Sequence, residues 1–250
     1  MRGSNPVLSR AILNRVPEVS KGRSRDLREV LIGYLLVLVI VWLPNPAQRI
    51  LFWVAFAWII YVTATSRQSW DDLGLRFSLN VASLLRAALL ISAAVLLAGM
   101  AVVIAIKFHT LHELYGSAPP GEHMWGYMIW AFMQQFILQT YFLARLMRLL
   151  PSRTLAVFTA AAMFASAHLP NPLLTAATFL WGAAACALFM RYRNLYSLGA
   201  IHAVLGLCVA FTVPNAVHHH MRVGLGYLRY HHDYPGKPSA PAPSLGRQKS

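Results

Sequence analysis

Long apolar blocks separated by short polar stretches dominate the sequence. Each block is close to the roughly 20 residues that a helix needs to cross the hydrocarbon of a bilayer. The blocks do not show the polar faces at helical period that a soluble bundle would carry. The pattern predicts an all-α, polytopic transmembrane helical bundle of about seven to eight spans. The seven clear segments are Glu29–Leu43, Ile50–Thr65, Val81–Phe108, Met124–Leu150, Arg153–Leu169, Pro172–Met190 and Leu195–Val213.

The regions on either side of these segments are polar and basic. Residues 1–28 are predicted to form a cytoplasmic N-terminal segment, because the first apolar run starts too late for a cleaved signal peptide. Residues 29–213 then form the transmembrane bundle. Residues 214–250 are expected to hold an interfacial or partly spanning segment over 215–230, followed by a basic, disordered tail rich in proline and serine.

Basic residues mark one side of the bundle. Lysine and arginine are enriched in cytoplasmic loops of membrane proteins. This rule places the N-terminus in the cytoplasm, together with residues 66–80, 145–153 and 191–193. Residues 44–49, 109–123 and 169–171 are then expected to face outward, whereas the side of the C-terminal tail stays open.

Composition supports a membrane protein. Of 250 residues, 57% are hydrophobic and only 12% are charged, and the mean hydropathy is +0.50. A soluble domain would carry about 25% charged residues. The net charge of +14 does not indicate a nucleic-acid partner, because the basic residues form no face with interleaved aromatics. Anionic lipid headgroups are the expected partner of this charge.

A few polar residues lie inside the apolar segments. Gln134 and Gln135 are adjacent in the fourth segment, with Gln139 one turn later, and His168 and His202 follow on later segments. Polar groups in hydrocarbon are costly, so such residues indicate a site. The alternative is hydrogen bonding between helices, worth about 1 kcal/mol or less per bond. Histidine can accept or donate a proton near neutral pH, whereas glutamine cannot.

Other histidines raise the question of a metal site. Catalytic zinc takes three protein ligands, and His168 with His202 supply only two. The loop string His109-Thr-Leu-His112-Glu113 does not match the HExxH spacing. The tail strings at 218–220 and 231–232 are expected at the interface or in solvent. We predict no metal ligands, and the sequence identifies no cofactor.

Three motifs in order resemble those of the CPBP family of intramembrane proteases, which includes the CAAX prenyl endopeptidases and the Abi proteins. The family pattern is EExxxR, then FxxxH, then HxxxN. The corresponding stretches here begin at Gln134-Gln135, at Phe164 and at His202, and the core of the resemblance covers about residues 120–213. Both glutamates are glutamine in this chain, the motif arginine is Gln139, and the motif asparagine is Gly206.

The resemblance implies a site and two functions that remain open. The implied catalytic positions are His168, His202, Gln134 and Gln135, with Gln139, Phe164 and Asn171 as binding positions. One function is a divergent endopeptidase that acts on membrane-associated peptides or prenylated proteins, with a histidine transferring the proton. The other is a non-catalytic pseudoprotease that binds a lipid or a membrane-protein partner. Either would lie in a bacterial inner membrane.

Overall fold

The computed structural model describes residues 6–66, 68–76, 80–111 and 120–233, and the side chains of 22–66, 68–76, 80–111 and 124–229. The described residues contain helices and no strand, which confirms the all-α class. The helices are α1 (Pro6–Trp42), α2 (Ala47–Ala64), α3 (Val81–Lys107), α4 (Pro120–Phe136), η1 (Ile137–Leu143), α5 (Ala144–Leu149), α6 (Arg153–Ser166), α7 (Pro172–Tyr192), α8 (Leu195–Thr212), α9 (Asn215–His218), η2 (His219–Met221) and α10 (Gly224–Asp233).

All seven predicted segments are helical, and most of their ends agree within a few residues. Polar side chains start several helices by accepting a hydrogen bond from a free backbone N–H of the first turn. Asn80, Ser152, Asn171 and Asn194 do this for α3, α6, α7 and α8. Four helices (α2, α3, α7 and α8) are long and apolar enough to cross a membrane. The predicted number of spans is therefore not confirmed, because α6, for example, has only 14 residues.

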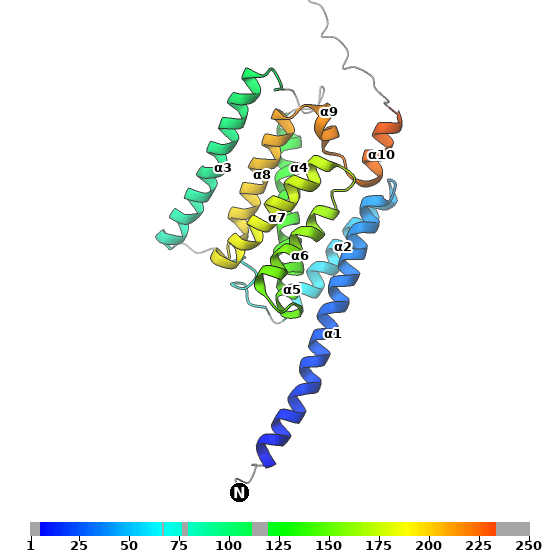
Figure 1. The fold of residues 1–250 in the computed structure, drawn as a ribbon, viewed down its shortest axis with the longest axis vertical. Helices are drawn as coiled ribbons and strands as arrows, with labels where there is room; N and C mark the ends of the chain where they lie inside the picture. The colour runs from blue at the N-terminus through cyan, green and yellow to red at the C-terminus, as the bar shows by residue number, and fades with distance from the viewer. Residues whose placement is uncertain (1–5, 67, 77–79, 112–119, 234–250) are drawn as a thin grey trace, which may run out of the picture.

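The helices form one bundle from which α1 projects (Figure 1). In the view of Figure 1, α4, α6, α7 and α8 occupy the middle of the bundle, and α3 lies at its edge. There α3 packs against α8. α10 lies beside the end of α1 that is remote from the N-terminus. The three motif helices therefore belong to the centre of the bundle.

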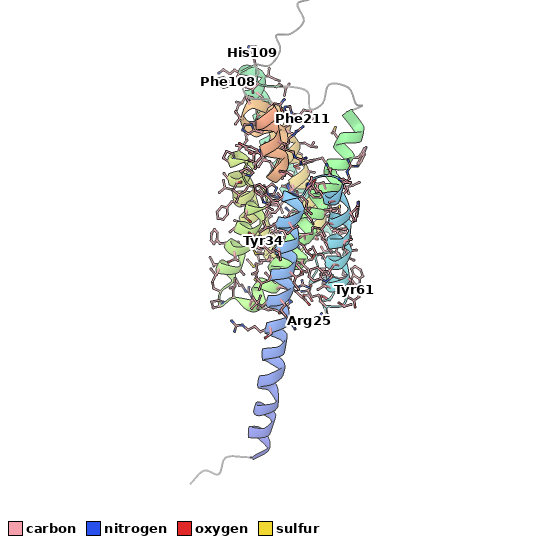
Figure 2. All side chains as sticks on the ribbon, turned by 90° about the vertical axis from the view of Figure 1, so that its right-hand side faces the viewer. Arg25, Tyr34, Tyr61, Phe108, His109 and Phe211 are labelled. Carbon is pink, nitrogen blue, oxygen red and sulfur yellow. The ribbon has the colours of Figure 1, made fainter. Side chains whose placement is uncertain are left out.

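The environment of α1 changes along its length, within one continuous helix. Figure 2 labels Arg25 near the point where α1 leaves the bundle and Tyr34 farther along, among the packed helices. Residues 22–25 are exposed, whereas Val30 is buried. At the opposite end of the bundle lie Phe108 and His109, which end α3 (Figure 2).

The fourth predicted segment is not a single α-helix. The glutamine pair lies at the end of α4, and a seven-residue π-helix, η1, follows directly before α5 begins. π-Helical turns are rare and are frequently found at functional sites. Six of the seven η1 residues are buried, so this irregular turn lies inside the protein.

Helices α6 and α7 make the closest contact in the bundle centre. Ala160 and Ala161 on α6 are fully buried. Across from them, a Cβ added to Gly182 of α7 would lie 3.3 Å from the Cα of Ala161. Small residues allow transmembrane helices to approach in this way. The contact gives a rigid support to the end of α6, where His168 follows.

Ion pairs fasten α1 to α5 at the end of the bundle that is predicted to be cytoplasmic. Arg145 is fully buried, and its Nε lies 2.7 Å from Oε2 of Glu29. The Arg145 guanidinium also lies 4.1 Å from the ring centroid of Tyr141. One turn away, Arg148 makes two hydrogen bonds of 2.7 Å to the carboxylate of Asp26. These contacts fix where α1 enters the bundle.

Candidate functional site

Four of the predicted site residues, Gln134, Phe164, His168 and His202, line one cavity of about 230 Å³. Gln134 reaches it from α4, His168 from the turn after α6, and His202 from α8. Most of the wall is apolar, with residues from α1, η1 and α7 among others. The cavity therefore suits an apolar ligand that also carries a few polar groups.

Phe164 lies between the two histidines. Its ring centroid is 4.9 Å from that of His168 and 6.0 Å from that of His202, with edge-to-face geometry in both pairs. Trp181 contacts His202 from another side, at 5.9 Å between centroids. The aromatic rings hold both imidazoles in place, which favours a preorganised site.

The hydrogen bond of His168 fixes its tautomer. Its Nδ1 lies 2.8 Å from the backbone carbonyl of Phe164, and a carbonyl oxygen can only accept a hydrogen bond. Nδ1 therefore carries the hydrogen in the neutral ring. The remaining ring nitrogen, Nε2, keeps its lone pair and can accept a proton from a ligand or from water.

The side-chain amides of Gln139 and Gln135 form a hydrogen-bonded chain that ends at His202. Nε2 of Gln139 donates to Oε1 of Gln135 at 3.2 Å, and Nε2 of Gln135 lies 3.1 Å from Nδ1 of His202. Both glutamines are fully buried. With this direction of the chain, Gln135 donates to Nδ1 and Nε2 of His202 carries the hydrogen; the backbone carbonyl of Ala131 also contacts the imidazole ring. The two histidines thus present an acceptor and a donor.

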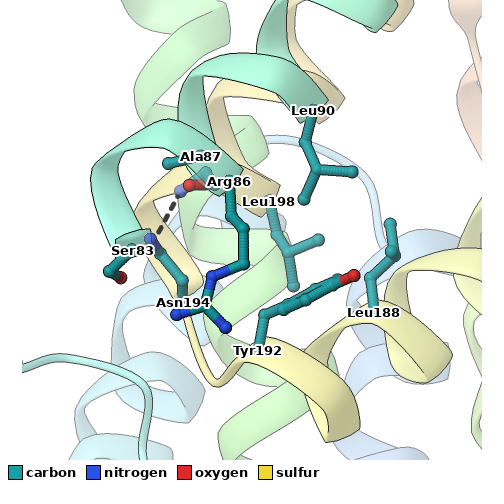
Figure 3. A pocket seen from close by; sticks show the side chains of 9 residues that line it. Ser83, Arg86, Ala87, Leu90, Leu188, Tyr192, Asn194 and Leu198 are labelled. Carbon is teal, nitrogen blue, oxygen red and sulfur yellow. Dashed lines mark hydrogen bonds between the residues drawn. The ribbon is translucent and has the colours of Figure 1, made fainter. Parts of the chain in front are cut away.

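Gln139 does not line this cavity. It lines a second, more polar cavity of about 220 Å³, together with Asp72, Arg148 and Arg193. Its Oε1 is buried and has no hydrogen-bond partner. A further crevice between α3, α7 and α8, around Arg86 and Tyr192 (Figure 3), contains none of the predicted site residues. The cavity with the two histidines is therefore the one that the motifs define.

Asn171 supports the site without lining the cavity, which differs from the predicted binding position. Its Oδ1 accepts from the backbone N–H of Leu174, and its Nδ2 donates to the carbonyls of His218 and Arg222. The bond to Leu174 caps α7, and the two bonds from Nδ2 fasten the segment 215–223, here called the C-terminal strap. Met221 and Val223 of this strap line the cavity. The hydrogen bonds of Asn171 therefore indicate that it keeps the C-terminal strap in place.

Asn171→Ala is expected to loosen the C-terminal strap. The change removes a helix cap worth about 1 kcal/mol and two hydrogen bonds to the strap. Trypsin cleavage after the exposed Arg222 should become faster in detergent solution. Asn194→Ala is the matched control, because Asn194 caps α8 through Ser197 but does not touch the strap. Equal cleavage rates for the two variants would contradict the role of Asn171.

The structure also reports on the other candidate positions. Among the described residues, no three His, Cys, Asp or Glu side chains gather in a way that could hold a metal ion. His112 and Glu113 lie outside the described residues, as do the side chains of His231 and His232 and the tail from residue 234. At position 206, where the motif asparagine would stand, a Cβ would lie 1.8 Å from the Tyr127 hydroxyl oxygen.

Tyr127 is a cavity residue that the motifs did not reveal. It precedes Gln134 by two helical turns and therefore shares its face of α4. That spacing was present in the sequence as a signal. What the sequence lacked was the contact with Gly206, because helices α4 and α8 meet only in the folded bundle.

The fold and the cavity define a class: a helical membrane protein with a polar site inside an apolar bundle. Residues 118–208 match a family model described as Type II CAAX prenyl endopeptidase Rce1-like. This match confirms, for that segment, the resemblance to the CPBP family of CAAX-protease-like proteins that the motifs indicate. Neither the curated proteins nor the solved structures gave a match to the chain.

Proposed function

We propose that this protein is a divergent intramembrane hydrolase that cleaves a membrane-associated peptide or a prenylated protein. The main support for this proposal is the tautomer of His168: its Nδ1–H donates to the Phe164 carbonyl, so Nε2 remains free to act as a base. The cavity is apolar enough to take a prenyl group or an apolar peptide segment. The match of residues 118–208 to a CAAX prenyl endopeptidase family model supports this substrate class.

The proposed reaction uses both histidines. Nε2 of His168 takes a proton from a water molecule, and the water oxygen bonds to the carbonyl carbon of the scissile amide. Nε2–H of His202 donates a hydrogen bond to the carbonyl oxygen as negative charge develops there. The C–N bond then breaks while His168 returns the proton to the leaving nitrogen. The products are a carboxylic acid and an amine.

A second candidate is a non-catalytic binding protein. It is favoured by one observation: no carboxylate lines the cavity among the described residues. The side chains at the two glutamate positions are neutral amides, and Gln135 is already used to hold His202. Such a neutral cavity could bind a lipid or a prenylated chain without turnover.

The restored-glutamate variant Gln134→Glu/Gln135→Glu distinguishes the two functions. Native protein, this variant and His168→Ala are purified and incubated with farnesylated and unprenylated peptides that end in a C-a-a-X sequence. The hydrolase proposal expects cleavage by native protein that His168→Ala abolishes. Cleavage that starts only when the glutamates are restored would support the binding protein, as would co-purification of a bound lipid.

A further inference from the structure

Seven side chains with a hydrogen-bonding group line the cavity that contains the histidines: Tyr34, Tyr127, Trp130, Gln134, His168, Thr178 and His202. Four of them are already bonded inside the protein. The Tyr34 hydroxyl lies 2.6 Å from Ser166 Oγ, and the Thr178 hydroxyl donates to the Leu174 carbonyl. The histidines are bonded through their Nδ1 atoms, as described above. Gln134, Tyr127 and the indole of Trp130 make no hydrogen bond to another described residue.

The position of the Tyr127 hydroxyl depends on a glycine of α8. A Cβ at residue 206 would lie 1.8 Å from the Tyr127 oxygen and 2.6 Å from the adjoining ring carbon. Any side chain at this position would therefore displace the end of the phenol. Gly206 is one helical turn after His202, so both face the same side of α8. The Tyr127 phenol therefore packs against the face of α8 on which His202 also lies.

A polar hydroxyl without a protein partner is unusual in this setting. Polar groups inside a membrane protein are costly unless they are bonded or serve a ligand. The Tyr34 hydroxyl in the same cavity shows how such a group is normally bonded, through Ser166. Tyr127 thus lines the cavity with a hydroxyl that has no hydrogen-bond partner among the described residues.

We propose that Tyr127 is a further catalytic residue, whose hydroxyl donates a hydrogen bond to the carbonyl oxygen of the bound substrate, and that Gly206 is the position that admits it. The proposal rests on the hydrolase function above and adds a second donor to Nε2–H of His202. Two donors that converge on one oxygen form an oxyanion site of the kind that stabilises acyl-transfer transition states. No proton is transferred by Tyr127, so the proton balance of the reaction is unchanged.

A purely structural role is the competing explanation. In that case Gly206 allows α4 and α8 to approach closely, and the Tyr127 ring fills the space between the two helices. The two explanations differ for Tyr127→Phe, which keeps the ring and removes only the hydroxyl. A filling role predicts no loss of function from this change, because phenylalanine occupies the same space apart from one oxygen atom.

The test compares Tyr127→Phe with Tyr34→Phe. Cleavage of a farnesylated C-a-a-X peptide is followed for native protein and both variants, with kcat and KM determined separately. Tyr127→Phe is expected to lower kcat by about 10²-fold, the usual effect of losing one oxyanion donor, with KM changed much less. Its thermal midpoint should equal that of native protein. Tyr34→Phe should lower the midpoint, because it breaks the bond to Ser166.

Gly206→Ala supplies a second route to the same result. The added methyl group pushes the Tyr127 hydroxyl away, so kcat should fall here too, and Gly206→Ala/Tyr127→Phe should be no worse than Gly206→Ala. A kcat for Tyr127→Phe within about threefold of native, well below the loss expected for one donor, would overturn the proposal.

If native protein binds the peptide without cleaving it, the hydrolase function fails by itself. The affinity of Tyr127→Phe for the peptide, measured by fluorescence polarisation, then tests the role of Tyr127. A roughly tenfold loss of affinity, about one hydrogen bond, supports contact with the substrate carbonyl, and an unchanged affinity overturns that contact. A peptide that is neither bound nor cleaved overturns both proposals.

Discussion

Glu29→Ala is expected to destabilise the protein by about 3–5 kcal/mol, the usual result of removing one partner from a buried ion pair. Arg145 is fully buried, and its Nε is bonded to the Glu29 carboxylate at 2.7 Å. Its Nη2 already has no partner, and Nη1 is bonded to the Tyr141 carbonyl. Without Glu29, the Arg145 charge has no carboxylate beside it. Thermal unfolding in detergent should show a midpoint lower by about 10 °C.

An exposed ion pair of this chain provides the control for Glu29. Asp71 and Arg76 are 2.9 Å apart, with side chains 61% and 71% exposed. Exposed pairs contribute about 0–1 kcal/mol, so Asp71→Ala should change the midpoint little. Glu29→Met/Arg145→Met should be more stable than Glu29→Met alone, because no unpaired charge remains. Similar midpoints for Glu29→Ala and Asp71→Ala would contradict the buried pair.

The sequence predicted the helices well because bilayer crossing imposes a strong and local constraint. Apolar blocks of the required length must be helical, since a membrane offers no partner for free backbone groups. The predicted segments therefore match the helices, including α8, which carries His202, and α6, which ends just before His168. The π-helix η1 was not predicted, because its residues are as apolar as those of an ordinary span and no proline or glycine marks the change.

The motifs predicted which residues meet, but not which contacts they make. Gln134, His168 and His202 do line one cavity. The tautomer of His168, in contrast, depends on a backbone carbonyl, and Asn171 bonds to carbonyls of a strap far along the chain. The pair of Glu29 and Arg145 likewise joins residues on two distant helices. A single sequence contains no signal for such tertiary contacts, and they decide the roles of these side chains.

His168→Ala is expected to lower kcat for the farnesylated peptide by about 10²–10⁴-fold, the usual contribution of a general base. The variant loses Nε2, which is the ring nitrogen left free by the bond between Nδ1 and the Phe164 carbonyl. The native rate should fall as the pH is lowered into the acid range, because a protonated imidazole cannot accept a proton. The residual rate of His168→Ala should lose this pH dependence.

His168→Asn separates the chemical role of His168 from its structural role. The asparagine amide can still donate to the Phe164 carbonyl, as Nδ1–H does, but it cannot take a proton from water. Both variants should therefore lose turnover to a similar extent, whereas only His168→Ala should also lose stability. Thermal midpoints in detergent and kcat values for the same three proteins decide this. If His168→Asn turned over substrate at the native rate, the general base would have to be another group. The first to examine would be Nε2 of His202, because rotating the side-chain amides of Gln135 and Gln139 by 180° would leave that nitrogen with a free lone pair.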